Sequence, residues 1–248
     1  MSIVVTGGGS GIGAATARHF AMRGAQVTIC GRQGDAIDEV ARSIGPNCRA
    51  VRADITIADD RRRLIDEAVG HGGGLEVLVN NAGNMYRGAI DSLNEASLLD
   101  VFHVNVVAAM LLTGLAVPHL ERRRGAVIFI GSIHNRRAFP GASPYAATKG
   151  AVLALSQSLA AELGAKSIRV NCVVPGAVPT HLNVRAGLAK DFESARARLE
   201  GLAPLHALRR IGTPEEVAEA IDYLVRSEWT TGAVLDVDGG LGLGLTDA

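Results

Sequence analysis

A tyrosine and a lysine four residues apart, Tyr145 and Lys149, are the strongest chemical signal in this sequence of 248 residues. Residues at this spacing share one face of a helix, so both side chains can point into one cleft. A free tyrosine titrates near pH 10, and an ammonium about 4 Å away at an effective dielectric near 20 stabilises the phenolate by roughly 4 kcal/mol. The pair therefore predicts a phenol with a lowered pKa that acts as a general acid or base. The alternative is an ordinary tyrosine and lysine on the surface of an amphipathic helix.

Two further polar residues stand at places where an α/β fold presents functional groups. Ser132 directly follows an apolar run that predicts a strand, and Asn105 is an amide within the otherwise apolar segment 101–106. The carboxyl ends of parallel strands open onto the cleft of such a sheet, so Ser132 is placed to contact a substrate. A turn or cap serine and a buried structural asparagine are the alternatives.

A glycine-rich turn follows the first apolar run of the chain. Residues 6–13 read TGGGSGIG and lead into a helical pattern. Glycines let a backbone turn tightly and approach a pyrophosphate, whose charge then meets the helix N-terminus. A flexible turn without a ligand is the alternative, but the position between a strand and a helix favours dinucleotide binding.

The elements that must position these residues alternate along the whole chain. Several β-branched runs are continuously apolar, as in parallel strands that are covered on both faces. The predicted strands are Ser2–Thr6, Gln26–Cys30, Cys48–Ala53, Leu75–Asn80, Ala126–Gly131, Ser167–Val174 and Ala233–Val237. The predicted helices are residues 11–23, 35–44, 57–70, 95–121, 144–163 and 213–226.

This alternation predicts an α/β fold with a doubly wound, seven-stranded parallel sheet and helices on both faces. Residues 180–207 interrupt the rhythm just before the last unit. A long insertion at such a place usually covers a ligand cleft. We therefore expect one domain over residues 1–248, with a substrate lid at about 180–207.

Composition and charge exclude several classes of protein. Lys plus Arg equals Asp plus Glu, 25 of each, so no global field attracts nucleic acid or an anionic membrane. We find neither an uninterrupted apolar stretch that would span a bilayer nor the basic start of a signal peptide. Cys30, Cys48 and Cys172 lack metal spacing and predict buried free thiols in a reducing compartment. The expectation is a cytoplasmic protein without a metal site and without nucleic-acid or membrane partners.

The motifs taken together identify a family. The TGGGSGIG turn, NNAG at residues 80–83 and the Tyr145-xxx-Lys149 pair resemble the short-chain dehydrogenase/reductase family in its ordinary single-domain branch. The sequence PGAVPT at residues 175–180 and the closing TG and DGG at 231–232 and 238–240 resemble that family as well. The resemblance covers essentially the whole chain. It implies a nucleotide-binding fold and reversible hydride transfer between a nicotinamide cofactor and a carbonyl or secondary alcohol.

The resemblance also implies roles for individual residues. The catalytic tetrad is Asn105, Ser132, Tyr145 and Lys149: Tyr145 transfers the hydroxyl proton, Ser132 holds the substrate oxygen, and Asn105 holds a water that connects the lysine to solvent. Lys149 also has the compact head that can bond cofactor ribose hydroxyls, which an arginine lacks. Ser132, His134 and Tyr145 are the predicted substrate contacts. A loop histidine satisfied by its neighbours is the alternative for His134.

The cofactor contacts implied by the resemblance are spread along the chain. An aspartate after the third strand meets the adenine, the NAG segment lies beneath the adenine ribose or ties strands together, and the PG-x-V-x-T stretch reaches the nicotinamide carboxamide. The predicted cofactor-binding residues are Thr6, Gly7, Gly9, Ser10, Gly11, Ile12, Gly13, Arg32, Asp54, Ile55, Asn81, Ala82, Gly83, Tyr145, Lys149, Pro175, Gly176, Val178 and Thr180.

The end of the second strand predicts a preference for NADP(H) over NAD(H). NAD-specific relatives carry an acidic residue there, whereas this chain has Gly31 followed by Arg32, which can bind a 2′-phosphate. Ser10 adds no second charge, and an Arg32 that faces solvent is the alternative. An NAD-dependent secondary-alcohol dehydrogenase therefore stays open, as does a non-catalytic nucleotide-binding regulator, although the intact tetrad argues against the latter.

The expected partners are a small carbonyl or alcohol substrate and further copies of the chain. Basic groups near the cleft, such as Arg136 and Arg185, would suit a polar or anionic substrate unless they face water. The sequence does not identify the substrate. The predicted helices 95–121 and 144–163 are apolar around much of their circumference, so we expect a homotetramer or homodimer.

Overall fold

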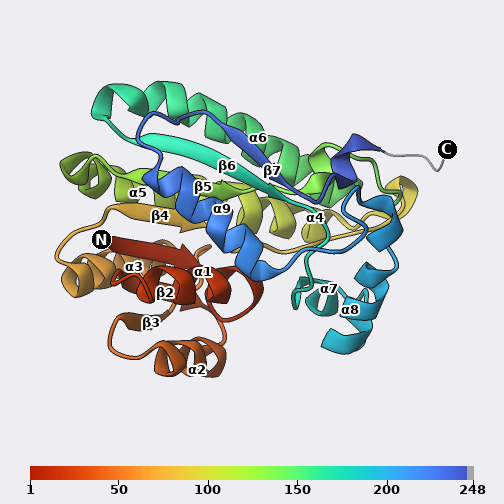
Figure 1. Cartoon of the computed structure of the whole chain (residues 1–248), viewed down its shortest axis with the longest axis horizontal. Coiled ribbons are helices and arrows are strands. Elements are labelled where there is room, and N and C mark those ends of the chain that lie inside the picture. The colour runs from red at the N-terminus through yellow and green to blue at the C-terminus, as the bar shows by residue number, and fades with distance from the viewer. Residues whose placement is uncertain (245–248) are drawn as a thin grey trace.

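The computed structural model describes residues 1–244 and arranges them around a parallel sheet of seven strands (Figure 1). The strand order is β3-β2-β1-β4-β5-β6-β7, so the chain winds outward from β1 in one direction and then from β4 in the other. The strands are β1 (Ser2–Thr6), β2 (Gln26–Gly31), β3 (Cys48–Arg52), β4 (Val77–Asn80), β5 (Ala126–Ile130), β6 (Arg169–Pro175) and β7 (Val234–Val237). The predicted doubly wound sheet is confirmed.

Helices cover both faces of this sheet (Figure 1). Alternate residues of β1 show the two sides: Ile3 and Val5 belong to the core beneath α1, α2 and α9, whereas Val4 belongs to the core beneath α3, α5 and α6. Burial on both faces explains the continuously apolar runs. The long helices are α1 (Gly11–Ala21), α2 (Gly34–Ile44), α3 (Ala58–Gly72), α4 (Glu95–Phe102), α5 (Ala108–Arg123), α6 (Ser143–Leu163) and α9 (Pro214–Arg226).

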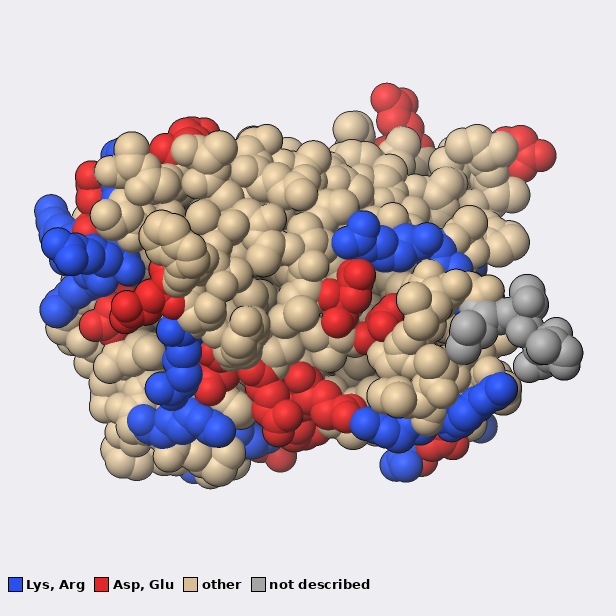
Figure 2. Space-filling view, turned by 45° about the horizontal axis from the view of Figure 1, so that its top comes forward, with Lys and Arg blue, Asp and Glu red and all other residues tan. Residues whose placement is uncertain are grey.

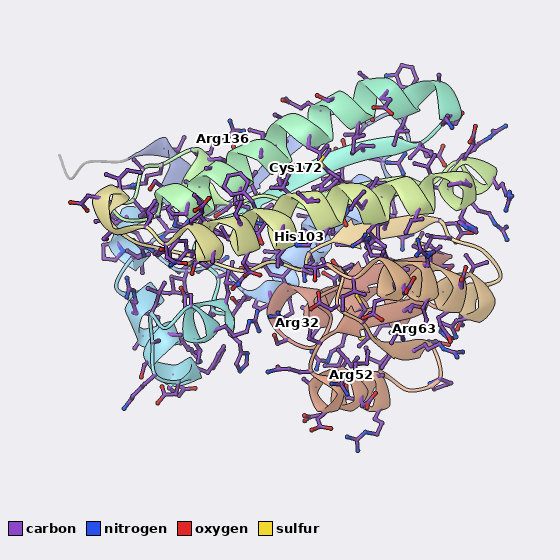
Figure 3. All side chains as sticks on the ribbon, turned by 180° about the vertical axis from the view of Figure 1, so that it is seen from behind. Arg32, Arg52, Arg63, His103, Arg136 and Cys172 are labelled. Atoms are coloured by element: carbon purple, nitrogen blue, oxygen red, sulfur yellow. The ribbon has the colours of Figure 1, made fainter. Side chains whose placement is uncertain are left out.

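The predicted helix 95–121 departs from regular α-helix in its middle. A π-helical turn, η2 (His103–Val107), joins α4 to α5, and the exposed His103 marks this junction in Figure 3. Such turns insert one extra residue into a helix and are frequent at functional sites. The helix predicted over residues 95–121 is present, but the π-helical turn within it was not predicted, because an apolar periodicity does not reveal a single inserted residue.

By length and composition, the helical unit Glu95–Arg123 could cross a membrane. In the structure one side of it packs into the core, where Val101, Ala108, Leu112 and Leu120 are fully buried. Packing against the sheet explains the apolar residues on that side. Its other side exposes several large apolar residues.

The predicted lid segment lies beyond the carboxyl ends of the strands, at the lower right of Figure 1. It contains two helices, α7 (Leu182–Arg185) and α8 (Phe192–Glu200), and a 3-10 turn, η5 (Ala203–Leu205). The rings of His181 and Phe192 stack with centroids 4.9 Å apart and connect α7 to α8. The segment therefore stands over the edge of the sheet where functional groups are presented.

Candidate functional site

A cavity of about 1270 Å³ runs along the carboxyl ends of the strands, from the glycine-rich turn to the lid. Most of the predicted site residues line it, including Arg32, Asp54, Ser132, Tyr145 and Lys149. Three predicted site residues do not line the cavity: Thr6, Gly13 and Asn105. Any contribution from them is therefore indirect, through the residues that do line it. One continuous cavity thus joins the predicted cofactor and substrate regions.

The glycine-rich turn forms one end of the cavity through its backbone. Gly7 and Gly11 adopt φ values of 67° and 53°, which glycine tolerates best. A Cβ on Gly13 would lie only 2.3 Å from the carbonyl oxygen of Gly7, so this position must be glycine for α1 to pack against the turn. Ser10 precedes α1 without capping it through its side chain, which leaves the first N–H groups of the helix for a ligand. An anion such as a pyrophosphate fits this arrangement.

Thr6 and Asn81 hold the floor of this region together. The Thr6 hydroxyl accepts hydrogen bonds from the backbone N–H groups of Asn81 and Ala82 at 3.0 and 2.9 Å. The Asn81 amide donates to the Thr6 carbonyl at 2.7 Å. The side chain of Asn81 therefore ties the end of β4 to β1, the alternative considered for it, while Thr6 is buried away from the cavity.

Cations surround the part of the cavity next to β2 and the lid. Arg32 follows β2 on the side that faces the lid in Figure 3, and both Arg18 of α1 and Arg185 of α7 also line the cavity. Burial lowers the pKa of the Arg185 guanidinium, and the charge of Arg32 lowers it further. An anion bound beside Arg185 would stabilise the charge of this guanidinium, which burial and Arg32 disfavour. Sequence reasoning missed Arg18, because an arginine on a helix carries no signal of what it faces.

Three of the four predicted catalytic residues converge in the middle of the cavity. Ser132 follows β5 by two residues, Tyr145 and Lys149 share one face of α6, and all three are at least nine-tenths buried. The Lys149 ammonium lies 5.6 Å from the centroid of the Tyr145 ring and donates a hydrogen bond to the Ile130 carbonyl at 2.7 Å. The helical spacing thus brings the phenol and the ammonium into one cleft, as expected.

The pKa of the phenol differs from our expectation. Burial raises the pKa of Tyr145 to about 12, and the Ser132 hydroxyl opposes only part of this shift. Burial also lowers the pKa of Lys149 to about 8. The prediction of a phenol pKa lowered toward neutrality was wrong for the protein by itself, because losing water penalises the phenolate more than the ammonium at this distance stabilises it. At neutral pH the phenol keeps its proton and the lysine is charged.

His134 contacts two of the predicted catalytic side chains. Its Nδ1 lies 3.0 Å from the Ser132 hydroxyl, and its ring packs edge-on against Tyr145 with centroids 5.1 Å apart. Burial, with the charges of Arg87 and Lys149, lowers the pKa of His134 to about 4. The imidazole is therefore neutral, and its tautomer decides whether Ser132 donates its proton to His134 or toward the cavity.

Asn105 lies on the π-helical turn, and its amide is fully engaged by the protein. Its oxygen accepts from the Asn84 backbone N–H at 2.7 Å, while its nitrogen donates to the Asn84 carbonyl and the Thr148 hydroxyl at 2.9 and 3.0 Å. These bonds join the loop after β4 to α6, one residue before Lys149. These bonds support the structural role considered as the alternative, and the role of Asn105 in holding a water stays a prediction.

Two other sequence-based hypotheses can be compared with the structure. Arg136 pairs with Asp236 at 3.3 Å and does not line the cavity; its label in Figure 3 lies above the lid segment. Within residues 1–244, no three His, Cys, Asp or Glu side chains gather to hold a metal ion. The cations that reach the substrate end of the cavity are Arg87 and Arg198 instead.

Comparisons with known proteins agree with this geometry. The sequence profile described as Enoyl-(Acyl carrier protein) reductase matches residues 7–242. The chain is 34% identical to dehydrogenase/reductase SDR family member 4 of Sus scrofa, covering 96% of this chain and 85% of that protein. It is 37% identical to L-fucose dehydrogenase of Bos taurus, covering 98% and 89%. The crystal structure of 3-ketoacyl-(acyl-carrier-protein) reductase from Brucella melitensis, complexed with NADH, superimposes with a TM-score of 0.88 at 30% identity over 97% of both chains.

Proposed function

The chain belongs to the short-chain dehydrogenase/reductase family, and from that premise we propose an NADP(H)-dependent oxidoreductase whose proton-transfer group is Tyr145. The family acts on CH–OH and C=O groups with a nicotinamide cofactor. The observation that carries the proposal is the meeting of Ser132, Tyr145 and Lys149 in the same cavity as the glycine-rich turn. A cofactor held by that turn would present its reactive ring to these side chains.

The mechanism follows from the state of each side chain. A nicotinamide cofactor, when bound, would supply or accept the hydride. Tyr145, with a pKa near 12, holds its proton at neutral pH and can give it to an oxygen that gains negative charge, as in carbonyl reduction. Ser132 donates a hydrogen bond to that oxygen when the Nδ1–H of His134 occupies its lone pair. Lys149 keeps a positive charge below its pKa of about 8 and stabilises the phenolate that remains.

The preference for NADP(H) is supported by charge at the β2 end of the cavity. Gly31 offers no carboxylate to repel a 2′-phosphate, and Arg32 extends into the cavity wall. Ser10 brings no charge, but Arg18 and Arg185 line the same cavity and supply the additional cations that the glycine loop lacks. Charge-assisted bonds to one phosphate favour NADP(H) by about ten- to hundredfold. The NADH bound to the Brucella reductase favours NAD(H) as the second candidate.

A second copy of the chain is the proposed partner of α5 and α6. Leu99, Val107, Met110 and Leu111 expose 43 to 63% of their surface on one side of the α4–α5 unit. The top of the molecule, where α6 lies in Figure 1, is turned toward the viewer in Figure 2 and shows a broad area without charged side chains. Paired helices from two subunits would bury both surfaces, giving a homodimer or homotetramer. Sedimentation of the parent and of Leu111→Arg, with Met22→Arg as an exposed control elsewhere, measures this.

A cytoplasmic location is part of the proposal. The structure contains Cys30, Cys48 and Cys172 as free cysteines. Cys30 and Cys172 are buried, and burial raises their thiol pKa values to about 12 and 11. Neutral, buried thiols suit a reducing compartment. Fractionation of the cells that make the protein tests this assignment.

The decisive test of the reaction is turnover by the parent and by Tyr145→Phe. A panel of ketones with NADPH, and of secondary alcohols with NADP⁺, is followed at the nicotinamide absorbance. The substitution removes only the proton donor, so turnover should fall by about a thousandfold while cofactor affinity changes little. Near-parental turnover by the variant would overturn the role of Tyr145, and a parent that uses no member of the panel would count against the proposed activity.

A further inference from the structure

The two ends of the cavity differ in charge. Within the described residues, Glu39 of α2 and Asp54 after β3 are the carboxylates that line the cavity, and both lie at the end next to β2 and β3. The opposite end is lined by Arg87 from the loop after β4 and by Arg198 from α8. Among residues 1–244, no acidic side chain lines this end of the cavity beside the second pair of cations. In that part of the chain, no carboxylate of the lining neutralises their charge.

Arg87 is fixed in place rather than free in solvent. It is half-buried, and its Nη2 donates to the Pro140 carbonyl at 2.6 Å. The backbone of Gly88 donates to the Gly141 carbonyl at 2.9 Å, so the loop that carries Arg87 is joined to the loop that precedes α6. One guanidinium bond is thus used by the protein, and in the described residues no carboxylate pairs with the remaining donors.

Arg87 also lies on the substrate side of the catalytic residues. Its charge reaches His134 and helps to lower the pKa of that imidazole, whose Nδ1 contacts Ser132. A group bound by Arg87 would therefore share the part of the cavity in which Ser132 and Tyr145 hold the substrate oxygen. Arg32 and Arg185, the cations of the cofactor end, belong to other elements.

Arg198 approaches Arg87 from the lid. Its Nη1 donates to the Leu188 carbonyl at 3.2 Å, which turns the side chain back toward the body of the lid. Burial lowers the pKa of Arg87, and the charge of Arg198 lowers it further. Two like charges that face one cavity from separate elements repel each other, and an anion between them removes the repulsion. Arg196, two residues earlier on α8, is instead paired with Glu200 at 2.9 Å.

The wall between these arginines and Ser132 is apolar. Met85, Phe139, Leu199 and Leu202 line it, and His134 adds a neutral ring that packs on Phe139 with centroids 4.6 Å apart. A substrate that reaches from Ser132 to Arg87 must therefore have an apolar or uncharged middle. Its far end meets only positive charge.

We propose that the substrate of this enzyme is a ketone or secondary alcohol that carries an oxyanion, a carboxylate or a phosphate, held between Arg87 and Arg198. This inference rests on the proposed function and adds the class of substrate to it. The lid contributes one of the two binding groups, so the anion also draws α8 toward the loop after β4.

Matched pairs of charged and neutral substrates test the inference. The carboxylate arm compares pyruvate, acetoacetate and 4-oxopentanoate with their methyl esters, and the phosphate arm compares dihydroxyacetone phosphate with dihydroxyacetone. Each pair is measured with the parent, Arg87→Met, Arg198→Met and the control Arg196→Met. In one arm the parent should favour the anion by about ten- to hundredfold in kcat/KM, as expected for a charge-assisted hydrogen bond. Arg87→Met and Arg198→Met should bring the ratio of kcat/KM for the anion over its neutral partner close to one, while Arg196→Met keeps the parental ratio.

Binding measured without turnover separates this inference from the proposed reaction. Calorimetry follows the same compounds as they bind to the parent and to Arg87→Met, each saturated with NADP⁺. If no compound is turned over but an anion binds in an Arg87-dependent manner, the proposed activity fails and the anion site stands. If neutral members are used or bound as well as the anions, or if Arg87→Met weakens both members equally, the inference is overturned. It is also overturned if no anion binds to the parent.

Discussion

The two ends of the cavity differ in whether backbone or side chains form the wall. At the cofactor end the wall is largely backbone: Gly7 and Gly11 turn the chain with positive φ, and α1 offers its first N–H groups. At the substrate end the wall is made of side chains such as Arg87, Phe139 and Leu202, which come from separate loops and from the lid. A backbone site tolerates no added atoms, whereas a side-chain site can change its specificity one residue at a time.

The difference also has an electrostatic side. The lining of the cofactor end contains both cations and carboxylates, the latter on α2 and after β3, whereas among the described residues the lining near Arg87 and Arg198 contains no carboxylate. The first end suits a large ligand with both hydroxyl and phosphate groups. The second suits one anion at the end of an uncharged spacer. Four substitutions distinguish the two ends, from the largest expected effect to the smallest.

Lys149 lies where the two ends meet, so its replacement should damage both. Lys149→Met removes the buried ammonium that stabilises the phenolate, and we expect kcat to fall about a hundred- to thousandfold. Loss of its hydrogen-bonding head should also weaken cofactor binding about tenfold. Stopped-flow turnover and cofactor titration measure the two effects, with Lys166→Met as control, since Lys166 is exposed and paired with Glu121. If Lys149→Met left the cofactor affinity unchanged, Lys149 would act in the catalytic step and would not bind the cofactor.

The substitution Gly13→Ala should disturb only the cofactor end, where the wall is largely backbone. The new Cβ would meet the Gly7 carbonyl at 2.3 Å, and no side-chain rotation relieves a contact with backbone. We expect a loss of about 2–3 kcal/mol in the free energy of unfolding and a matching loss of cofactor affinity. Denaturant unfolding and cofactor titration check this against Gly114→Ala, where a Cβ meets nothing within 4 Å. Parental cofactor binding by Gly13→Ala would contradict a rigid backbone cradle.

Arg32→Ala alters the one feature of the cofactor end that depends on a side chain. The ratio of kcat/KM for NADPH over NADH should fall about ten- to hundredfold, because a charge-assisted bond to the 2′-phosphate is lost. Arg185→Ala should shift the ratio in the same direction. Arg52, on the neighbouring strand and outside the cavity lining, is the control (Figure 3). A parent that prefers NADH, or a ratio that Arg32→Ala leaves unmoved, would favour the NAD(H) alternative.

At the substrate end, the buried imidazole of His134 should make the free energy of unfolding depend on pH. Its pKa in the folded protein is about 4, against 6.5 for an ordinary histidine. Between these pH values the unfolded state binds a proton at this imidazole and the folded state does not. The contribution of this neutral imidazole to the free energy of unfolding is therefore complete above pH 6.5 and is lost as the pH falls toward 4. Between pH 7 and 5 the parent should lose about 1–2 kcal/mol more unfolding free energy than His134→Gln. Urea unfolding at both pH values measures this, and equal losses would show that the imidazole is not held neutral.

The sequence alone determined the architecture and the backbone end of the site. Continuous apolar runs predicted the seven strands, because parallel strands in this fold are buried on both faces. The glycines of residues 7–13 and the Tyr145–Lys149 spacing are local patterns, and local geometry follows from them directly. One local feature was not predicted: the π-helical turn at His103–Val107 inserts a single residue that a helical periodicity does not reveal.

Only the tertiary structure decided the charges and protonation states around the cavity. Arg136 looked available next to Ser132 but pairs with Asp236, a hundred residues away, whereas Arg87 and Arg198 meet from separate elements. The pKa of Tyr145 depends on how much water the folded protein removes, and that burial reverses the direction expected from Lys149 alone. Side chains from distant segments converge only when those segments pack together. Desolvation depends on all the atoms that surround a group. A local stretch of sequence therefore predicts neither the convergence of side chains nor their desolvation.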